Sequence, residues 1–100
     1  MTTRTVTVVN PLGLHARAAA KFVHIATTFE AHIRVGRDAR VMDGKSIMGI
    51  LLLAAARGTT LTITAEGPDE SRAVEALARL VETGFGEPPT GLGPGASWNA

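Results

Sequence analysis

The chain alternates between stretches with the two-residue period of strands and stretches with the spacing of amphipathic helices. Strand-like alternation of apolar and polar residues occurs at 5–9, 31–35 and 60–65, with a short further run at 40–42. Helical spacing occurs at 16–28, at 47–57, and in a third segment that starts in 67–70 and stops near Gly84. This order, β-α-β-β-α-β-α, predicts one sheet covered by helices on one face. A ferredoxin-like sheet begins with the same order, so periodicity alone leaves the strand order open.

The same periodicity assigns the residues of the core. In the strands, the residues predicted to point inward are Val6, Val8, Ile33, Val35, Leu61, Ile63 and Ala65. In the first and third helices they are Ala19, Phe22, Val23 and Ala26, and Ala73, Leu77, Leu80 and Val81. Arg17, Lys21 and His24 fall on the opposite face of the first helix.

The second predicted helix carries more apolar residues than one buried face requires. Ile50 and Leu53 can fill the core, with Ala54 on the same side. That leaves a second apolar group, made of Ile47, Met48 and Leu51, on or near the exposed side. Exposed apolar residues on a helix indicate a docking patch, and methionine adapts to partners of different shape. The alternative is a core that extends deeper than this.

Composition and charge exclude several classes of protein. The 100 residues are 45% hydrophobic, include no cysteine and carry a net charge of +1, which together predict a globular domain without disulfides or cysteine-bound metal. The near-neutral charge and low aromatic content argue against nucleic-acid binding. The first residues lack the apolar stretch that a signal peptide requires, and the apolar run at 47–56 is too short to span a bilayer. We therefore expect a cytoplasmic protein without membrane contact.

The composition changes near the C-terminus. Glycine and proline dominate from Gly86 onward, so we expect one domain over 1–87 and a flexible tail over 88–100. Trp98 lies near the end of this tail. It is either an incidental residue of a loose terminus or part of a peptide-like docking element.

The pentapeptide Gly13-Leu14-His15-Ala16-Arg17 carries the main candidate chemistry. It stands where a loop turns into a helix, so free backbone N–H groups and the helix dipole favour an anion beside the histidine. A neutral imidazole can attack phosphorus, since only that form has a free lone pair. These features predict that His15 receives a phosphoryl group, whose oxygens the N–H of Ala16 and the guanidinium of Arg17 then bind. The alternative is that His15 only caps the helix.

Other polar residues carry weaker signals. His24 and His32 lack metal-ligand spacing with carboxylates or thiols, so we expect solvated side chains and no metal site. Ser46 directly precedes the second helix and is a good N-cap, worth about 1 kcal/mol. A phosphate on Ser46 would be tolerated at a helix start but would place negative charge beside the apolar patch.

Several segments resemble HPr, the histidine phosphocarrier of the bacterial phosphoenolpyruvate phosphotransferase system. They are the stretch 10–20, Gly44-Lys45-Ser46-Ile47-Met48-Gly49, Arg57-Gly58-Thr59 and Glu66-Gly67-Pro68-Asp69-Glu70. The resemblance covers 6–86 and implies an α+β open-faced β-sandwich, whose antiparallel sheet has the order 1-4-2-3 and carries three helices on one face. It implies that His15 accepts the phosphoryl group at Nδ1 from phospho-Enzyme I and donates it to EIIA-type domains. Such a protein is a stoichiometric carrier without cofactor rather than an enzyme, and we expect a monomer.

The resemblance also implies a partner surface and a regulatory site. Residues matching those that meet Enzyme I and EIIA domains are Ala16, Ala20, Ile47, Met48 and Leu51. The serine matching Ser46 is modified in many bacteria by an HPr kinase/phosphorylase. One departure is Ala18, which stands where most relatives have proline and keeps a backbone N–H in the first helical turn.

The branch of the family is left open. The stretches Asn10-Pro11-Leu12-Gly13 and Thr83-Gly84-Phe85-Gly86-Glu87 are similar to NPr, the nitrogen-branch paralogue. An alternative function is a regulatory binding module controlled at Ser46. Relatives of that kind lack the active histidine, so His15 favours the phosphocarrier.

Overall fold

The computed structural model of the protein describes residues 1–87, so the predicted tail over 88–100, with Trp98, lies outside the described residues. The elements are β1 (Thr2–Thr7), α1 (Ala16–Thr27), β2 (His32–Arg37), β3 (Arg40–Asp43), α2 (Ile47–Leu52), β4 (Thr60–Glu66), α3 (Glu70–Glu82) and a short 3-10 helix η1 (Gly84–Gly86). The predicted order of strands and helices is confirmed.

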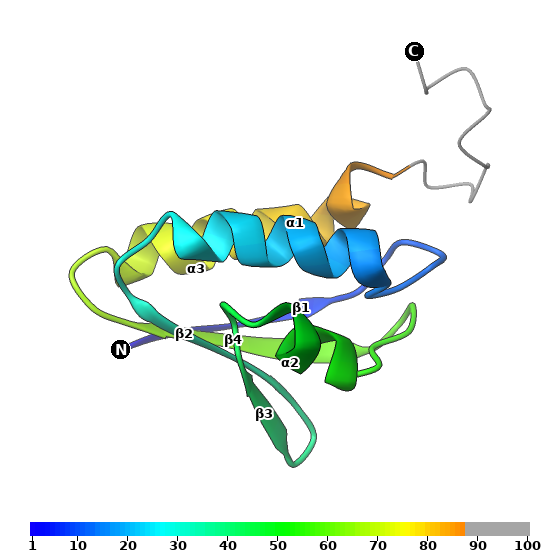
Figure 1. Ribbon diagram of the computed structural model, residues 1–100, viewed down its shortest axis with the longest axis horizontal. Helices are drawn as coiled ribbons and strands as arrows, with labels where there is room; N and C mark the ends of the chain where they lie inside the picture. The colour runs from blue at the N-terminus through cyan, green and yellow to red at the C-terminus, as the bar shows by residue number, and fades with distance from the viewer. Residues whose placement is uncertain (88–100) are drawn as a thin grey trace.

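The strands form a four-stranded sheet with the order β1-β4-β2-β3, and every neighbouring pair is antiparallel. This confirms the order that the resemblance implied. Figure 1 shows α1 and α3 lying side by side across the sheet, with α2 close to β3 and the start of α1. The sheet is therefore covered by helices on one side.

The core lies between the sheet and these helices. All strand residues predicted to point inward are buried, and so are the predicted faces of α1 and α3, apart from the partly buried Leu80. Phe22 and Phe85 are the largest of the fully buried side chains among the described residues. Each buried side chain of this size stabilises the fold by about 1.5–3 kcal/mol. Because the fold depends on this burial, the alternation of apolar and polar residues identifies the buried positions well.

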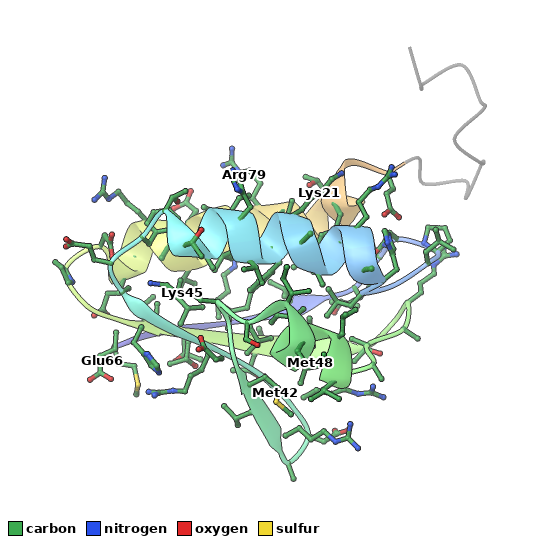
Figure 2. The ribbon with its side chains drawn as sticks, viewed as in Figure 1. Lys21, Met42, Lys45, Met48, Glu66 and Arg79 are labelled. Carbon is green, nitrogen blue, oxygen red and sulfur yellow. The ribbon has the colours of Figure 1, made fainter. Side chains whose placement is uncertain are left out.

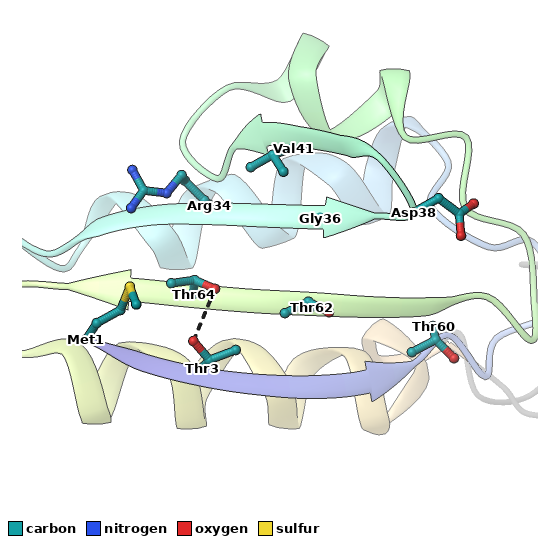
Figure 3. Close-up of a pocket in the computed structure, with 9 residues that line it drawn as sticks. All are labelled: Met1, Thr3, Arg34, Gly36, Asp38, Val41, Thr60, Thr62 and Thr64. Carbon is teal, nitrogen blue, oxygen red and sulfur yellow. Dashed lines mark hydrogen bonds between the residues drawn. The ribbon is translucent and has the colours of Figure 1, made fainter.

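The opposite face of the sheet is polar and open. Figure 3 shows a hollow on it, lined by Met1, Thr3, Arg34, Gly36, Asp38, Val41, Thr60, Thr62 and Thr64. The Thr3 and Thr64 hydroxyls lie 3.3 Å apart across the β1–β4 pair. His32 of β2 is exposed, as predicted, and so is His24 of α1. An antiparallel sheet with one solvated face accounts for the strict alternation of threonine with apolar residues in β4.

Helix α2 is shorter than the sequence predicts. It ends at Leu52, because Ala54 takes a left-handed backbone conformation with a φ of 50° that turns the chain away. Arg37 holds this end by donating 2.8 Å hydrogen bonds to the carbonyl oxygens of both Leu53 and Ala54. Ala54 is consequently exposed rather than part of the core, and Ala55 is buried in its place.

Two strand boundaries also differ from prediction. The β2–β3 turn lies at Asp38, whose φ is 53°, while Gly36 and Arg37 still pair with β3. Strand β1 begins at Thr2 and ends at Thr7, earlier than the alternation over 5–9 predicts. Val8 nevertheless stays in the core and bonds to the chain before β4, with its N–H donating to the Thr59 carbonyl oxygen at 2.9 Å.

The start of α3 is an electrostatic cluster at the end of the molecule away from η1 (Figure 1). Glu70 accepts hydrogen bonds from the Met1 amine at 2.8 Å and the Thr2 hydroxyl at 2.6 Å, and these bonds lower the pKa of its carboxyl to about 2. The pKa of Asp69 is also lowered, because the backbone N–H groups of Glu30 and Ala31 donate to its carboxylate at 2.9 Å. Both carboxylates therefore join α3 to neighbouring segments.

Candidate functional site

The loop between β1 and α1 is fixed by backbone and side-chain hydrogen bonds. The Asn10 side-chain amide donates to the Gly13 carbonyl oxygen at 2.9 Å, and the Gly13 N–H donates back to the Asn10 carbonyl oxygen at 3.1 Å. Gly13 has a φ of 66°, which favours glycine. The Leu14 N–H then donates to the Ala55 carbonyl oxygen at 2.9 Å, and the Leu14 side chain is buried. The residue that follows is held in place by this frame.

His15 is the N-cap of α1, where the sequence placed it. Its backbone is extended, with φ −75° and ψ 176°, and its carbonyl oxygen accepts the first helical hydrogen bond, from the Ala19 N–H at 2.8 Å. The N–H groups of Ala16 and Arg17 therefore precede the hydrogen-bond ladder of the helix and are oriented to bind an anion. The His15 side chain is 27% exposed, so the ring is reachable from solvent.

The two nitrogens of the His15 ring have different partners. Nδ1 accepts a long hydrogen bond of 3.4 Å from the Ala18 N–H, a group that proline would lack. Nε2 contacts the Oε2 atom of Glu87. Ala18 is fully buried in the first turn of α1, so the departure from the family pattern lies directly beneath the ring.

Glu87 reaches the ring from the last described part of the chain. After η1 the Glu87 N–H donates to the Gly84 carbonyl oxygen at 3.0 Å, and Phe85 anchors this turn in the core. The Lys21 ammonium donates to the Phe85 carbonyl oxygen at 2.7 Å, and Figure 2 shows Lys21 reaching from α1 toward η1. Asn10 Nδ2 donates to Glu87 Oε1 at 2.9 Å.

No sequence pattern indicated a role for Glu87. The residue stands at the predicted boundary of the domain, 72 positions from His15, and no periodicity connects the two. The one local signal is the apolar Phe85 within a glycine-rich stretch, which indicates that the segment returns to the core before the chain ends. The structure buries Asn10 completely, whereas its sequence context indicated only a residue of a turn.

Arg17 and the cations of α1 line one side of the site. Arg17 is exposed and borders a surface hollow of about 470 Å³ together with Ala20, Lys21, His24, Ile25 and Leu80. Its guanidinium is accessible to an anion arriving at the start of α1. The structure thus places His15 and Arg17 at the same helix terminus, as predicted.

Apolar residues beside the site are exposed. Met48 is 67% exposed and Ile47 45% exposed on α2, and Met48 is labelled on this helix in Figure 2. Ala16 and Ala20 are exposed on α1, which packs against α2, whereas Leu51 is partly buried against the core. The sequence did not single out Leu12 and Leu52, which are exposed as well.

Ser46 is the N-cap of α2, as predicted. Its hydroxyl oxygen accepts a hydrogen bond of 3.0 Å from the Gly49 N–H. Asp43 caps the preceding turn by accepting from the Lys45 N–H at 2.9 Å. The structural role of Ser46 is therefore clear.

The described part of the chain supports neither a metal site nor a membrane-spanning helix. Within residues 1–87, no group of three or more histidine, cysteine, aspartate or glutamate side chains is placed to hold a metal ion. Among the helices of that same range, none is long and apolar enough to cross a membrane.

The sequence model of the family described as "PTS HPr component phosphorylation site" matches residues 2–83. The chain belongs to the HPr family. HPr proteins are histidine phosphocarriers of the phosphotransferase system rather than catalysts, and their partners are Enzyme I and EIIA domains. The predicted family, carrier function and general class of partner are therefore confirmed.

Individual relatives agree over nearly the whole of their length. The chain is 46% identical over 87 residues to the phosphocarrier protein HPr of Cupriavidus necator, covering 87% of this chain and 98% of the relative. It is 48% identical over 83 residues to HPr of Pseudomonas aeruginosa, covering 82% and 92% respectively. The crystal structure of HPr-C-His from Thermoanaerobacter tengcongensis has a TM-score of 0.85 at 43% identity, covering 88% of this chain and 99% of that one.

Proposed function

We propose that His15 is the phosphoryl acceptor of this member of the HPr family, and that it takes the group from phospho-Enzyme I and passes it to an EIIA-type domain. The observation that carries the proposal is the partly exposed His15 ring at the N-terminus of α1. There the ring is accessible to a donor, and the backbone N–H groups of Ala16 and Arg17 are available to an anion.

The transfer is a displacement at phosphorus. The lone pair of the neutral ring forms a P–N bond, while the bond between phosphorus and the donor atom breaks and its electron pair stays with the donor. The phosphoryl oxygens then receive hydrogen bonds from the Ala16 and Arg17 N–H groups and from the Arg17 guanidinium. A site that is only partly enclosed lets the group leave again, which a carrier requires.

Apolar residues of α1 and α2, exposed except for the partly buried Leu51, form the proposed partner surface, made of Ala16, Ala20, Ile47, Met48 and Leu51. Support comes from the exposure of most of these side chains and from the packing of α1 against α2. A surface of this kind allows successive docking of Enzyme I and an EIIA domain on a monomeric carrier.

Ser46 is proposed as a regulatory phosphorylation site for an HPr kinase/phosphorylase. Its position directly before Ile47 and Met48 places a modifying phosphate beside the proposed docking residues. About two negative charges there would oppose burial of that surface by a partner.

The decisive experiment is incubation of the purified protein with Enzyme I and phosphoenolpyruvate. Intact mass measured at neutral pH should show one added phosphoryl group, and brief acid treatment should remove it. His15→Ala should abolish the adduct, whereas His32→Ala, which changes an exposed histidine of β2, should keep it. Persistence of the adduct in His15→Ala would move the acceptor elsewhere.

A further inference from the structure

The side chains of Asn10, Glu87 and His15 form a chain of contacts that the carrier function alone does not explain. Asn10 is 1% exposed, and its Nδ2 donates at 2.9 Å to both the Gly13 carbonyl oxygen and Glu87 Oε1. Because both partners are acceptors, the amide nitrogen rather than the oxygen must face them. This fixes one oxygen of the Glu87 carboxylate and leaves the other, Oε2, against His15 Nε2.

We propose that Glu87, held by Asn10, is a positioning residue that keeps the ring proton of His15 on Nε2 and so makes Nδ1 the phosphoryl-accepting atom. This inference rests on the proposed function of His15. A carboxylate can only accept a hydrogen bond, so Nε2 must donate to it. A neutral imidazole carries a single N–H, which leaves the lone pair on Nδ1.

A second contact selects the same tautomer. The Ala18 N–H donates to Nδ1 at 3.4 Å, and a donor facing Nδ1 requires a lone pair there. This bond is long, so the lone pair is easily released to attack phosphorus. The Glu87 carboxylate is charged and so attracts the Nε2 proton more strongly than a neutral acceptor would, which sets the tautomer, and the long contact with Ala18 agrees with it.

The arrangement also balances the charge that transfer creates. When Nδ1 bonds to phosphorus and the donor bond breaks, the ring keeps its Nε2 proton and becomes cationic. Glu87 Oε2 lies where it can stabilise that positive charge, as the buried carboxylate of a catalytic triad does for its histidine. The Glu87 side chain is only 13% exposed, so solvent screens this interaction weakly.

Residue Glu87 lies beyond the stretch 2–83 that the family model matches. Its role therefore follows from the contacts in this chain and not from the family assignment.

Glu87→Gln gives a sharp test. The glutamine oxygen would keep the bond from Asn10 and turn an NH₂ donor toward Nε2, which favours the opposite tautomer with the proton on Nδ1. Glu87→Ala would weaken the preference without reversing it, because the long contact of Nδ1 with the Ala18 N–H remains. Glu82→Gln is the matched control, because Glu82 is an exposed acid that pairs with Arg4 at 3.1 Å.

The primary readout is the ¹⁵N NMR spectrum of the His15 ring, recorded where the ring is neutral, with backbone spectra confirming that each variant is folded. The wild-type protein and Glu82→Gln should show Nε2–H, Glu87→Gln should shift toward Nδ1–H, and Glu87→Ala should lie between them. The initial rate of phosphorylation by Enzyme I should fall about tenfold or more in Glu87→Gln, with Glu82→Gln unchanged.

A wild-type tautomer in both Glu87 variants would overturn the proposal, even if their phosphorylation slowed. If Glu87→Gln failed to fold, the tautomer of Glu87→Ala would decide the matter. Failure of the proposed function is recognised separately, because His15→Ala would then still be phosphorylated.

Discussion

The N–H of Leu14 donates a 2.9 Å hydrogen bond to the carbonyl oxygen of Ala55, which joins the His15 loop to the segment that follows α2. This bond is available because α2 ends at Leu52 and the chain then turns at Ala54 toward the site. The backbone frame of His15 thus depends on a helix end from another part of the chain. Changes on either side of this contact should affect the site.

Gly13→Ala should destabilise the protein by about 2 kcal/mol or more, because two costs combine. A Cβ atom at Gly13 would lie 2.5 Å from the Ala55 carbonyl oxygen, and the φ of 66° disfavours other residues. Gly58→Ala is the control, with a φ of 90° but no atom within 4 Å of the added carbon. Urea unfolding should show the larger loss for Gly13→Ala, and equal losses would mean that the close approach to Ala55 relaxes freely.

Met48→Asp should slow phosphoryl transfer from Enzyme I about tenfold while leaving the free energy of unfolding unchanged. Met48 is 67% exposed beside the site, so a charge there costs the fold little but must be desolvated on docking. Val41→Asp is the matched control, since Val41 is 61% exposed on β3 and lines the hollow of the open sheet face. Initial transfer rates test this, and equal slowing in both variants would place the interface elsewhere.

Ser46→Ala should lower the free energy of unfolding by about 1 kcal/mol, because the Gly49 N–H loses its 3.0 Å partner at the start of α2. Ser46→Asp should restore much of that stability, since aspartate is also a good N-cap, yet should weaken Enzyme I docking through its charge. Denaturation and transfer rates separate the two effects. The regulatory proposal itself requires a mass increase after incubation with a cognate kinase, and an unchanged mass would retire it.

Stability should fall in acid through Glu70. Its carboxyl pKa is lowered from an ordinary 4.5 to about 2 in the folded protein, so the unfolded chain binds the proton more tightly. The stabilisation is therefore present above about 4.5 and is lost as the pH falls toward about 2. Glu70→Gln should flatten this part of the pH profile of unfolding, whereas Glu75→Gln, an exposed acid of the same helix, should not. Identical profiles for wild type and Glu70→Gln would contradict the assignment.

Ala18→Pro should leave His15 competent for phosphorylation. The substitution removes the N–H that donates to Nδ1 at 3.4 Å, but the Glu87 contact with Nε2 is untouched. The ring should therefore keep its tautomer in Ala18→Pro and lose the preference only when Glu87→Ala is added. ¹⁵N NMR of the single and double variants checks this, and a tautomer change in Ala18→Pro alone would make Ala18 the controlling residue.

The sequence predicted the elements and the core well, because the buried face of each strand and helix leaves its own period. It could not predict where α2 ends. The chain turns there at Ala54, and Arg37 of β2 and Arg40 of β3 hold that end by donating to its carbonyl oxygens. Contacts of this kind leave no local pattern in the sequence. The strand order 1-4-2-3 came from the family resemblance rather than from periodicity.

The site was predicted in the same uneven way. His15 and Arg17 sit in one short motif whose chemistry can be read directly, and the structure places both at the start of α1. Glu87 meets His15 only because η1 folds the chain back over the β1–α1 loop. Tertiary packing brings the carboxylate to the ring, so beyond the apolar Phe85 the sequence carried no sign of the contact.

The two ends of the described chain differ in how much a fusion or a cut there would disturb the histidine site. The Met1 amine is bound to Glu70, so a fusion peptide at the N-terminus perturbs a salt bridge far from the histidine. A reporter or a protease cut placed just upstream of Glu87 would instead remove the ring's partner. If Glu87 positions the ring as proposed, assays on protein altered at this end would measure a histidine that lacks its partner.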